Sequence, residues 1–307
     1  MPQGQLDLFD PAVTHPPKKR RAKGRRNVLL EMMRLTLIVC RRQLNDYSCP
    51  KSKRTFTQPQ LLACLVLKTI QKRSYRGTIE LLEASDALRE AMGLSSVPAH
   101  TTLKEFADRV LTPQLIDTLV GEVLKLLQEQ GLVVEEVAVD STGVESNSAS
   151  MHFISRCKRG REGYIKLSLA VSCVSIVLVS LCASVGPSND LCEANDLLWR
   201  ASSRCSPDWL LADSGYDAEW VHRFAEKAWD ARSHIPPVPK TKDGSIKSGP
   251  GRKRSGRATP YVYGRRWHAE SFISGMKRMC GSTLNGRSLR TLLTEASLKA
   301  LAYAIRR

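Results

Sequence analysis

The sequence predicts an α+β protein in which a helical region precedes a region of strands and helices. Apolar residues recur at helical spacing between residues 27 and 131, in pieces short enough to form a compact bundle. After Gly131 the pattern changes to apolar runs that are typical of strands. The first 26 residues are rich in Pro, Lys and Arg and predict a disordered basic arm. We therefore expect three regions, at residues 1–26, 27–131 and 132–307.

The composition favours a polyanionic partner. The 307 residues include 47 Lys and Arg against 30 Asp and Glu, which gives a net charge of +17. Basic side chains gain affinity for phosphates by releasing counterions, so nucleic acid is the leading partner class and an anionic membrane surface the second. Nine cysteines without a CxxC pair indicate reduced, structural thiols. Because the first residues carry no secretory signal, we expect a cytoplasmic, nucleoid-associated protein.

The basic arm carries two motifs. The run Pro17–Arg26 has seven positive charges and no acid, so it predicts phosphate binding, with a solvated tail as the alternative. The segment QLDLF resembles the short peptide by which bacterial polymerases and repair factors bind the sliding clamp. Its Leu and Phe side chains suit pocket anchors and its Gln suits backbone hydrogen bonds. The candidate phosphate-binding residues are Lys18, Lys19, Arg20 and Arg21, and the candidate clamp-binding residues are Gln5, Leu6, Leu8 and Phe9.

The helical region has clear helix signals. Thr57 predicts an N-cap, and Thr102 followed by Glu105 predicts a capping box at a later helix. A long amphipathic helix is expected to end at Gly131. Several short helices with basic exposed faces are typical of a helix-turn-helix DNA reader, although most small helical bundles bind no DNA. We expect a DNA-binding domain here, with a bundle that serves only packing as the alternative.

The region after Gly131 contains one segment, Leu167–Gly186, that is uncharged and long enough to cross a bilayer. Five serines interrupt it and Val and Ile outnumber Leu, which favours two adjacent buried strands over a membrane helix. A crossover helix is expected at residues 186–204, a flexible basic loop at 240–260, and helices at 267–281 and 289–307. Strands are expected at residues 132–141, 151–156, 164–172, 175–186 and 209–217, with a proline-limited edge strand at 233–240.

Three acidic residues are candidates for a metal site. Asp140 and Asp213 each end an apolar strand, where rigid strands can bring carboxylates together as a two-metal site requires. The alternative is that each aspartate caps a turn. Glu270 lies on a predicted helix, with Arg266 four residues before it and Lys277 seven after, so all three share one face. Such a face suits phosphate and metal binding, and the alternative is an ordinary solvated helix face.

The spacing of Tyr263, Arg266, Glu270 and Lys277 resembles the Tyr-Arg-Glu-Lys signature of DDE transposases from bacterial insertion sequences. The contexts VDSTGV around Asp140 and LLADSGYD around Asp213 are also similar to those of this family. The resemblance covers roughly residues 50 to 307.

The resemblance implies a ribonuclease H-like catalytic domain, a mixed sheet flanked by helices. In such a domain Asp140, Asp213 and Glu270 hold two Mg²⁺ ions, for which Mn²⁺ substitutes. The implied enzyme cuts DNA at element ends and joins the 3′ ends to target DNA by two-metal phosphoryl transfer. Tyr263 and Arg266 then contact DNA near the cleaved end and Lys277 its phosphate, and a homodimer brings two DNA ends together.

The basic loop adds a candidate DNA clamp, for which a solvated surface loop is the alternative. Two other functions share the same acids. One is a catalytically degenerate, transposase-derived DNA-binding protein, and the other is a ribonuclease H-like nuclease without strand transfer. The candidate residues of this DNA clamp, which is distinct from the sliding clamp above, are Arg252, Lys253 and Arg254.

Overall fold

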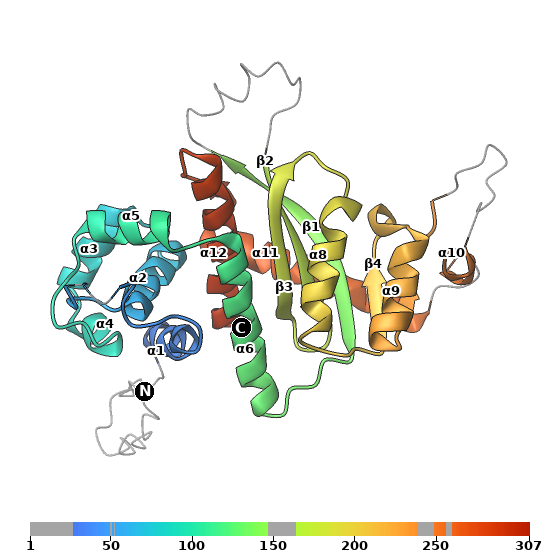
Figure 1. Ribbon diagram of the computed structural model, residues 1–307, viewed down its shortest axis with the longest axis horizontal. Coiled ribbons are helices and arrows are strands. Elements are labelled where there is room, and N and C mark those ends of the chain that lie inside the picture. Colours follow the sequence, from blue (N-terminus) through green and yellow to red (C-terminus); the bar gives the residue numbers. More distant parts are fainter. Residues whose placement is uncertain (1–26, 50, 52, 147–163, 239–248, 256–259) are drawn as a thin grey trace, which may run out of the picture.

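The computed structural model describes residues 27–49, 51, 53–146, 164–238, 249–255 and 260–307. In this part of the chain a mixed sheet has helices on both faces, and a group of short helices lies at one end of the molecule (Figure 1). The basic arm at 1–26 with its two motifs, the expected strand at 151–156 and most of the basic loop at 240–260 lie outside the described residues.

Six helices form the first described region, and side-chain caps set where most of them begin. The Thr57 side chain accepts a hydrogen bond from the backbone N–H of Gln60, and the Gln60 side chain accepts one from the backbone N–H of Thr57, which confirms the predicted cap. Gly131 has φ of 93° just after the last of these helices, so the predicted end is confirmed as well. The helices are α1 (Val28–Arg41), α2 (Gln58–Ile70), α3 (Tyr75–Glu83), α4 (Asp86–Ala91), α5 (His100–Arg109) and α6 (Pro113–Glu129).

The predicted capping box at Thr102 is wrong. Helix α5 begins at His100, as soon as the chain leaves Pro98, and its N-cap position is Ala99, which makes no side-chain cap. Thr102 is therefore already inside the first helical turn, whereas a capping residue needs extended backbone.

Five strands form the main sheet, in the order β3-β2-β1-β4-β5. Strand β1 pairs antiparallel with β2 and parallel with β4, and a short strand β6 pairs with its far end. β2 and β3 are antiparallel neighbours, so the two-strand interpretation of the uncharged segment is confirmed. No described helix is both long and apolar enough to span a membrane. The strands are β1 (Glu136–Ser146), β2 (Tyr164–Ser172), β3 (Val177–Gly186), β4 (Trp209–Ala212), β5 (Arg232–His234) and β6 (Thr283–Leu284).

Side chains alternate between two apolar cores along the strands. Val137 and Val139 of β1 pack with α8 (Leu191–Ser202) and α9 (Glu219–Trp229), whereas Ala138 packs on the opposite face with α11 (Trp267–Cys280) and α12 (Leu289–Arg306). The edge strand β5 is shorter than predicted, because the chain leaves the sheet before Pro236 and Pro237. Part of the basic loop forms a short helix, α10 (Pro250–Ser255), which contacts α9.

The helical region and the sheet share one core. Helix α6 packs against β3, and α12 packs against α2 and α6 (Figure 1). The predicted boundary after Gly131 therefore marks a change of secondary structure, while the buried side chains continue across it.

The C-terminal end of α11 is held by two lysines, one from α12 and one from the turn after α2. The buried Lys299 of α12 donates hydrogen bonds to the backbone carbonyls of Cys280, Gly281 and Thr283, at 2.7–3.0 Å. Lys72, just after α2, donates a hydrogen bond to the carbonyl of Arg278 at 2.9 Å. These bonds satisfy carbonyls that the end of a helix leaves without a partner, and cations there also favour the helix dipole.

A substitution at Gly275 is expected to disturb the packing of α11. A Cβ atom at Gly275 would clash with the Tyr303 hydroxyl and lie 2.5 Å from Tyr303 Cζ. The Tyr303 ring packs edge-on against Phe272 at 4.8 Å, so it has little room to move away. We expect Gly275→Ala to lower the free energy of unfolding by about 1–3 kcal/mol, as overpacked cores do. Chemical denaturation measures the loss, and Gly264→Ala, where a Cβ meets open space, is the control.

Candidate active site

Asp140 lies inside β1, and Asp213 follows β4 directly. The prediction that Asp140 ends its strand is wrong, because β1 continues to Ser146 along β2. The parallel pairing with β4 does stop at Val139, one residue before Asp140, and its partner Ala212 is one residue before Asp213. The two aspartates therefore occupy equivalent positions, where the two neighbouring strands part.

Local hydrogen bonds hold both aspartates. The backbone N–H of Ser141 donates to Asp140 Oδ1 at 2.9 Å, and that of Gly215 donates to Asp213 Oδ1 at 2.9 Å. Asp213 thus caps the short 3-10 helix η2 (Ser214–Tyr216), as the turn-capping alternative predicted. Each carboxylate also has a second oxygen, so these hydrogen bonds still leave an oxygen of each aspartate that can bind a metal ion.

Glu270 lies in the first turn of α11. Its Oε1 accepts a hydrogen bond from Arg266 Nη2 at 2.5 Å, and the Glu270 side chain is 54% exposed. Arg266 ends the 3-10 helix η3 (Tyr261–Arg266), in which its guanidinium lies 6.0 Å from the centroid of the Tyr263 ring. The Tyr263 ring packs against His234, with the centroids 4.7 Å apart. Tyr263, Arg266 and Glu270 thus form a contiguous set across the junction of η3 and α11.

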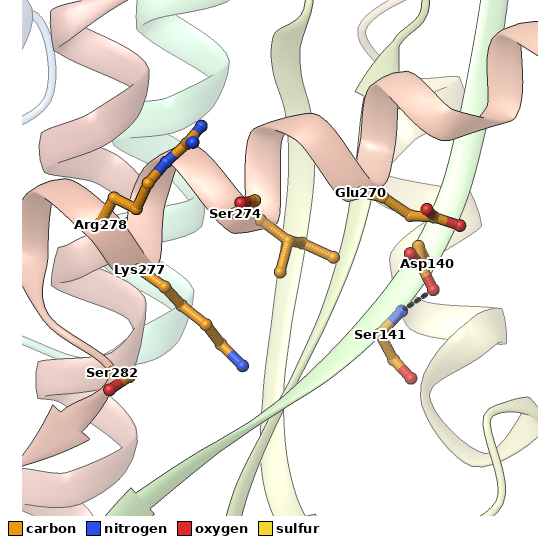
Figure 2. A pocket seen from close by; sticks show the side chains of 8 residues that line it. Asp140, Ser141, Glu270, Ser274, Lys277, Arg278 and Ser282 are labelled. Atoms are coloured by element: carbon orange, nitrogen blue, oxygen red, sulfur yellow. Dashed lines mark hydrogen bonds between the residues drawn. The ribbon is translucent and has the colours of Figure 1, made fainter.

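The charges of Asp213 and Glu270 act on the carboxyl group of Asp140. The pKa of Asp140 is raised to about 6, mainly by burial and in smaller part by the charges of Asp213 and Glu270, while the Ser141 N–H and Arg266 oppose the shift. Figure 2 shows the Glu270 and Asp140 side chains pointing toward one another across the gap between α11 and β1. A negatively charged centre of this kind favours a cation or a proton.

A groove of about 480 Å³ extends from Asp140 and Glu270 along α11 (Figure 2). Lys277 reaches from α11 toward β1 and donates a hydrogen bond to the Gly143 carbonyl at 2.8 Å. Burial lowers the pKa of Lys277. The groove therefore has carboxylates at one end and cationic side chains at the other. Its lining residues are Asp140, Ser141, Glu270, Ile273, Ser274, Lys277, Arg278 and Ser282.

The three basic residues of the predicted DNA clamp differ in their exposure to solvent. Lys253 and Arg254 are exposed, but Arg252 is only 4% exposed. The Arg252 guanidinium donates to both oxygens of Asp217, at 2.5 and 2.6 Å, so its charge is committed inside the protein. A run of basic residues predicts a solvated surface. Here, however, Arg252 is buried in an ion pair with Asp217, which lies 35 residues earlier in the sequence. We therefore leave Arg252 out of the candidate DNA contacts.

Several residues at the site were not predicted to belong there. Arg265 pairs with the buried Glu136, and His268 donates a hydrogen bond from Nδ1 to the Arg265 carbonyl and stacks on Trp267. Asp190 and Lys166 lie on the opposite face of β1 from Asp140. Asp190 accepts a hydrogen bond from the Ser141 hydroxyl, and Lys166 forms an ion pair with Asp190. A signal for Lys166 existed, because a lysine inside the apolar run YIKLSLAVS needs a buried partner.

The carboxylates suit a divalent metal ion in their chemistry. Asp140, Asp213 and Glu270 are hard oxygen ligands, which Mg²⁺ prefers, and a cation would stabilise the charged form of Asp140, which burial and the neighbouring acids disfavour. Among the described residues, however, no group of three His, Cys, Asp or Glu side chains is already arranged around one metal position. The Arg266–Glu270 ion pair accounts for part of this, since it turns one Glu270 oxygen to the guanidinium.

Comparison with known proteins gives one family. The family described as "Transposase DDE domain" matches residues 135–305, which include all three acids and the Tyr263–Lys277 segment. No curated protein matches the chain. Among solved structures, the piggyBac transposase synaptic complex with hairpin DNA is similar, with 8% identity and a TM-score of 0.44 over 91% of this chain and 71% of that one.

Proposed function

The chain belongs to the transposase DDE domain family, and from this premise we propose that it cuts DNA at the ends of an insertion sequence and joins the 3′ ends to target DNA. The observation that carries this proposal is that Asp140 and Glu270 line one end of a groove whose other end carries Lys277 and Arg278, while the charge of Asp213 also acts on Asp140. The mixed sheet with helices on both faces supports a ribonuclease H-like catalytic domain.

The three carboxylates are the proposed ligands of two Mg²⁺ ions. Bound metal would activate the attacking oxygen and stabilise the leaving oxygen at phosphorus. Asp140 and Asp213 are held for this task by backbone N–H groups, and neither has to leave its strand edge. Glu270 has to exchange its hydrogen bond with Arg266 for a metal ion, which frees the guanidinium for a DNA phosphate.

The proposed DNA contacts follow the groove and the basic segments. Lys277 is in position to meet a phosphate beside the acids, and Tyr263 and Arg266 flank the same end. Lys253 and Arg254 on α10, the basic arm with Lys18, Lys19, Arg20 and Arg21, and the helices of residues 27–131 are the proposed contacts for the rest of the DNA. We also propose a homodimer on DNA, and sliding-clamp binding through Gln5, Leu6, Leu8 and Phe9.

The test is a plasmid reaction with the full-length chain. Supercoiled plasmid that carries the cognate element ends is incubated with protein and Mg²⁺ or Mn²⁺, and the products are sequenced. Joined products with cut 3′ ends are expected. Nicks without joining would favour a ribonuclease H-like nuclease, and binding without cutting would favour a degenerate DNA-binding protein.

Binding of the sliding clamp is tested separately. Wild-type protein is expected to co-purify with the sliding clamp of its host, and the Leu8→Ala, Phe9→Ala variant is expected to lose it because both pocket anchors are removed. Equal recovery of the clamp with both proteins would contradict this part of the proposal.

A further inference from the structure

A charged network lies behind β1, on the face opposite Asp140. Lys166 of β2 is only 3% exposed, and its ammonium lies 2.9 Å from a carboxylate oxygen of Asp190 and 2.9 Å from one of Glu193. It also donates to the Ser188 carbonyl at 3.0 Å. Burial by itself would lower the pKa of Lys166, but the hydrogen bonds to Glu193 and Asp190 raise it above its ordinary value. The lysine is therefore a buried cation that fixes two acids at the start of α8.

Asp190 connects this cation to the strand that carries Asp140. The Ser141 hydroxyl donates a hydrogen bond to Asp190 Oδ1 at 2.5 Å, and Ser141 is also the residue whose N–H holds Asp140. Successive strand residues point to opposite faces, so Ser141 faces Asp190 while Asp140 faces α11. Any movement of Asp190 would therefore be passed to the backbone at Asp140.

Asp190 also lies against the turn that carries Asp213. A Cβ atom at Gly215 would clash with Asp190 Oδ2 and would lie 3.0 Å from Asp213 Oδ1. Gly215 is the residue whose N–H holds Asp213, so it is packed between the two aspartates. Only a glycine permits this close approach.

The buried phenol of Tyr216 lies within reach of the same acids. Its side chain is 1% exposed, and its pKa is raised first by burial and then by the charges of Asp190, Asp140 and Asp213. Asp190 thus belongs to the same negatively charged region as the two strand-edge acids, although Lys166 neutralises it.

We propose that the Lys166–Asp190 ion pair positions Asp140 and Asp213 for divalent-metal binding, acting through Ser141 on one strand and Gly215 on the other. This inference rests on the proposed function, because it concerns the metal site of that reaction. Lys166 and Asp190 are positioning residues, since neither of them lines the groove. Partners that orient metal ligands in this way contribute about 10–100-fold to metal affinity or activity.

The test measures Mn²⁺ binding by the full-length protein, through the loss of the free Mn²⁺ signal in electron paramagnetic resonance. We expect Lys166→Met and Asp190→Asn to weaken Mn²⁺ affinity by about 10–100-fold. Asp117→Asn is the matched control, because Asp117 forms a similarly buried ion pair with Arg204, between α6 and the segment after α8, and contacts no proposed ligand. Its Mn²⁺ affinity is expected to equal that of the wild type even if its stability falls.

Ser141→Ala keeps the test decisive if the charge variants fail to fold. It removes only the hydroxyl that links β1 to Asp190, so weaker Mn²⁺ binding is expected, and Ser141→Thr is expected to restore it because it retains a hydroxyl. Wild-type affinity in Ser141→Ala, Lys166→Met and Asp190→Asn would overturn the positioning role and leave the proposed function standing. A wild-type protein that binds no Mn²⁺, with or without DNA, would overturn the metal site itself.

Discussion

Glu270→Gln is expected to lower the rates of DNA cleavage and joining about a thousandfold, because the loss of one anionic ligand removes several kcal/mol of transition-state stabilisation. DNA binding is expected to persist. The amide keeps the size of the side chain, and the substitution leaves Arg266 without its carboxylate partner, which adds positive charge beside the groove. Single-turnover cleavage and a filter-binding titration on the same end DNA measure the two effects separately.

Glu226→Gln is the matched control for this experiment. Glu226 lies on α9, its side chain is 63% exposed, and it forms only a 3.8 Å ion pair with Arg254. It is expected to cut and join at the wild-type rate. Retained cleavage by Glu270→Gln would contradict the assignment of the third acid, and loss of DNA binding by Glu270→Gln would indicate a structural role for it.

Arg252→Ala is expected to cause the largest loss of stability, about 3–5 kcal/mol, because it removes the guanidinium that forms a buried ion pair with the carboxylate of Asp217. The side chains of Arg252 and Asp217 are only 5% and 2% exposed, and Asp217 also accepts a hydrogen bond from the Val238 N–H at 2.8 Å. The pair therefore fixes α10 and the segment after β5 to the turn that follows Asp213. The midpoint of denaturant unfolding measures the loss.

Two variants show whether the buried charge is the cause. Lys253→Ala changes the exposed neighbour on the same helix and is expected to alter stability by less than about 0.5 kcal/mol. Asp217→Asn combined with Arg252→Met removes both charges while keeping an acceptor for Val238, so it is expected to recover most of the loss. A small loss of stability in Arg252→Ala together with weaker DNA binding would instead restore Arg252 to the DNA-binding surface.

Local patterns predicted most of the fold. The run YIKLSLAVS has the same bounds as β2, and the caps at Thr57 and the end at Gly131 follow from short-range backbone chemistry. Thr102 shows the limit of such signals, since the threonine and glutamate have the spacing of a capping box but the N-cap of the helix is Ala99, three residues earlier. Local sequence can show which helix ends are favourable, but Pro98 and the packing of α5 decide which one forms.

The sequence predicted those parts of the site that depend on residues close together in the chain. The spacing of Arg266 and Glu270 indicated their ion pair, and the apolar strands placed Asp140 and Asp213 at one edge of the sheet. The role of Asp190 depends on Lys166 and Ser141, which come from two other strands, so its surface-like position in the sequence gave no indication of it. The sequence placed Arg252 among the DNA contacts for the same reason, because its ion-pair partner Asp217 lies on another element.

The anchoring of α11 at its C-terminal end has a consequence for the decay of the gene. Glu270 lies in the first turn of a helix whose last carbonyls are hydrogen-bonded by Lys299, so a stop codon between codons 281 and 299 would remove that support although all three proposed metal ligands would still be translated. A missense change at Lys72 would loosen the same helix from the other side. A gene that keeps the codons of all three acids can therefore still encode an unstable protein, and the codons for Lys72 and Lys299 are where such a gene should be inspected.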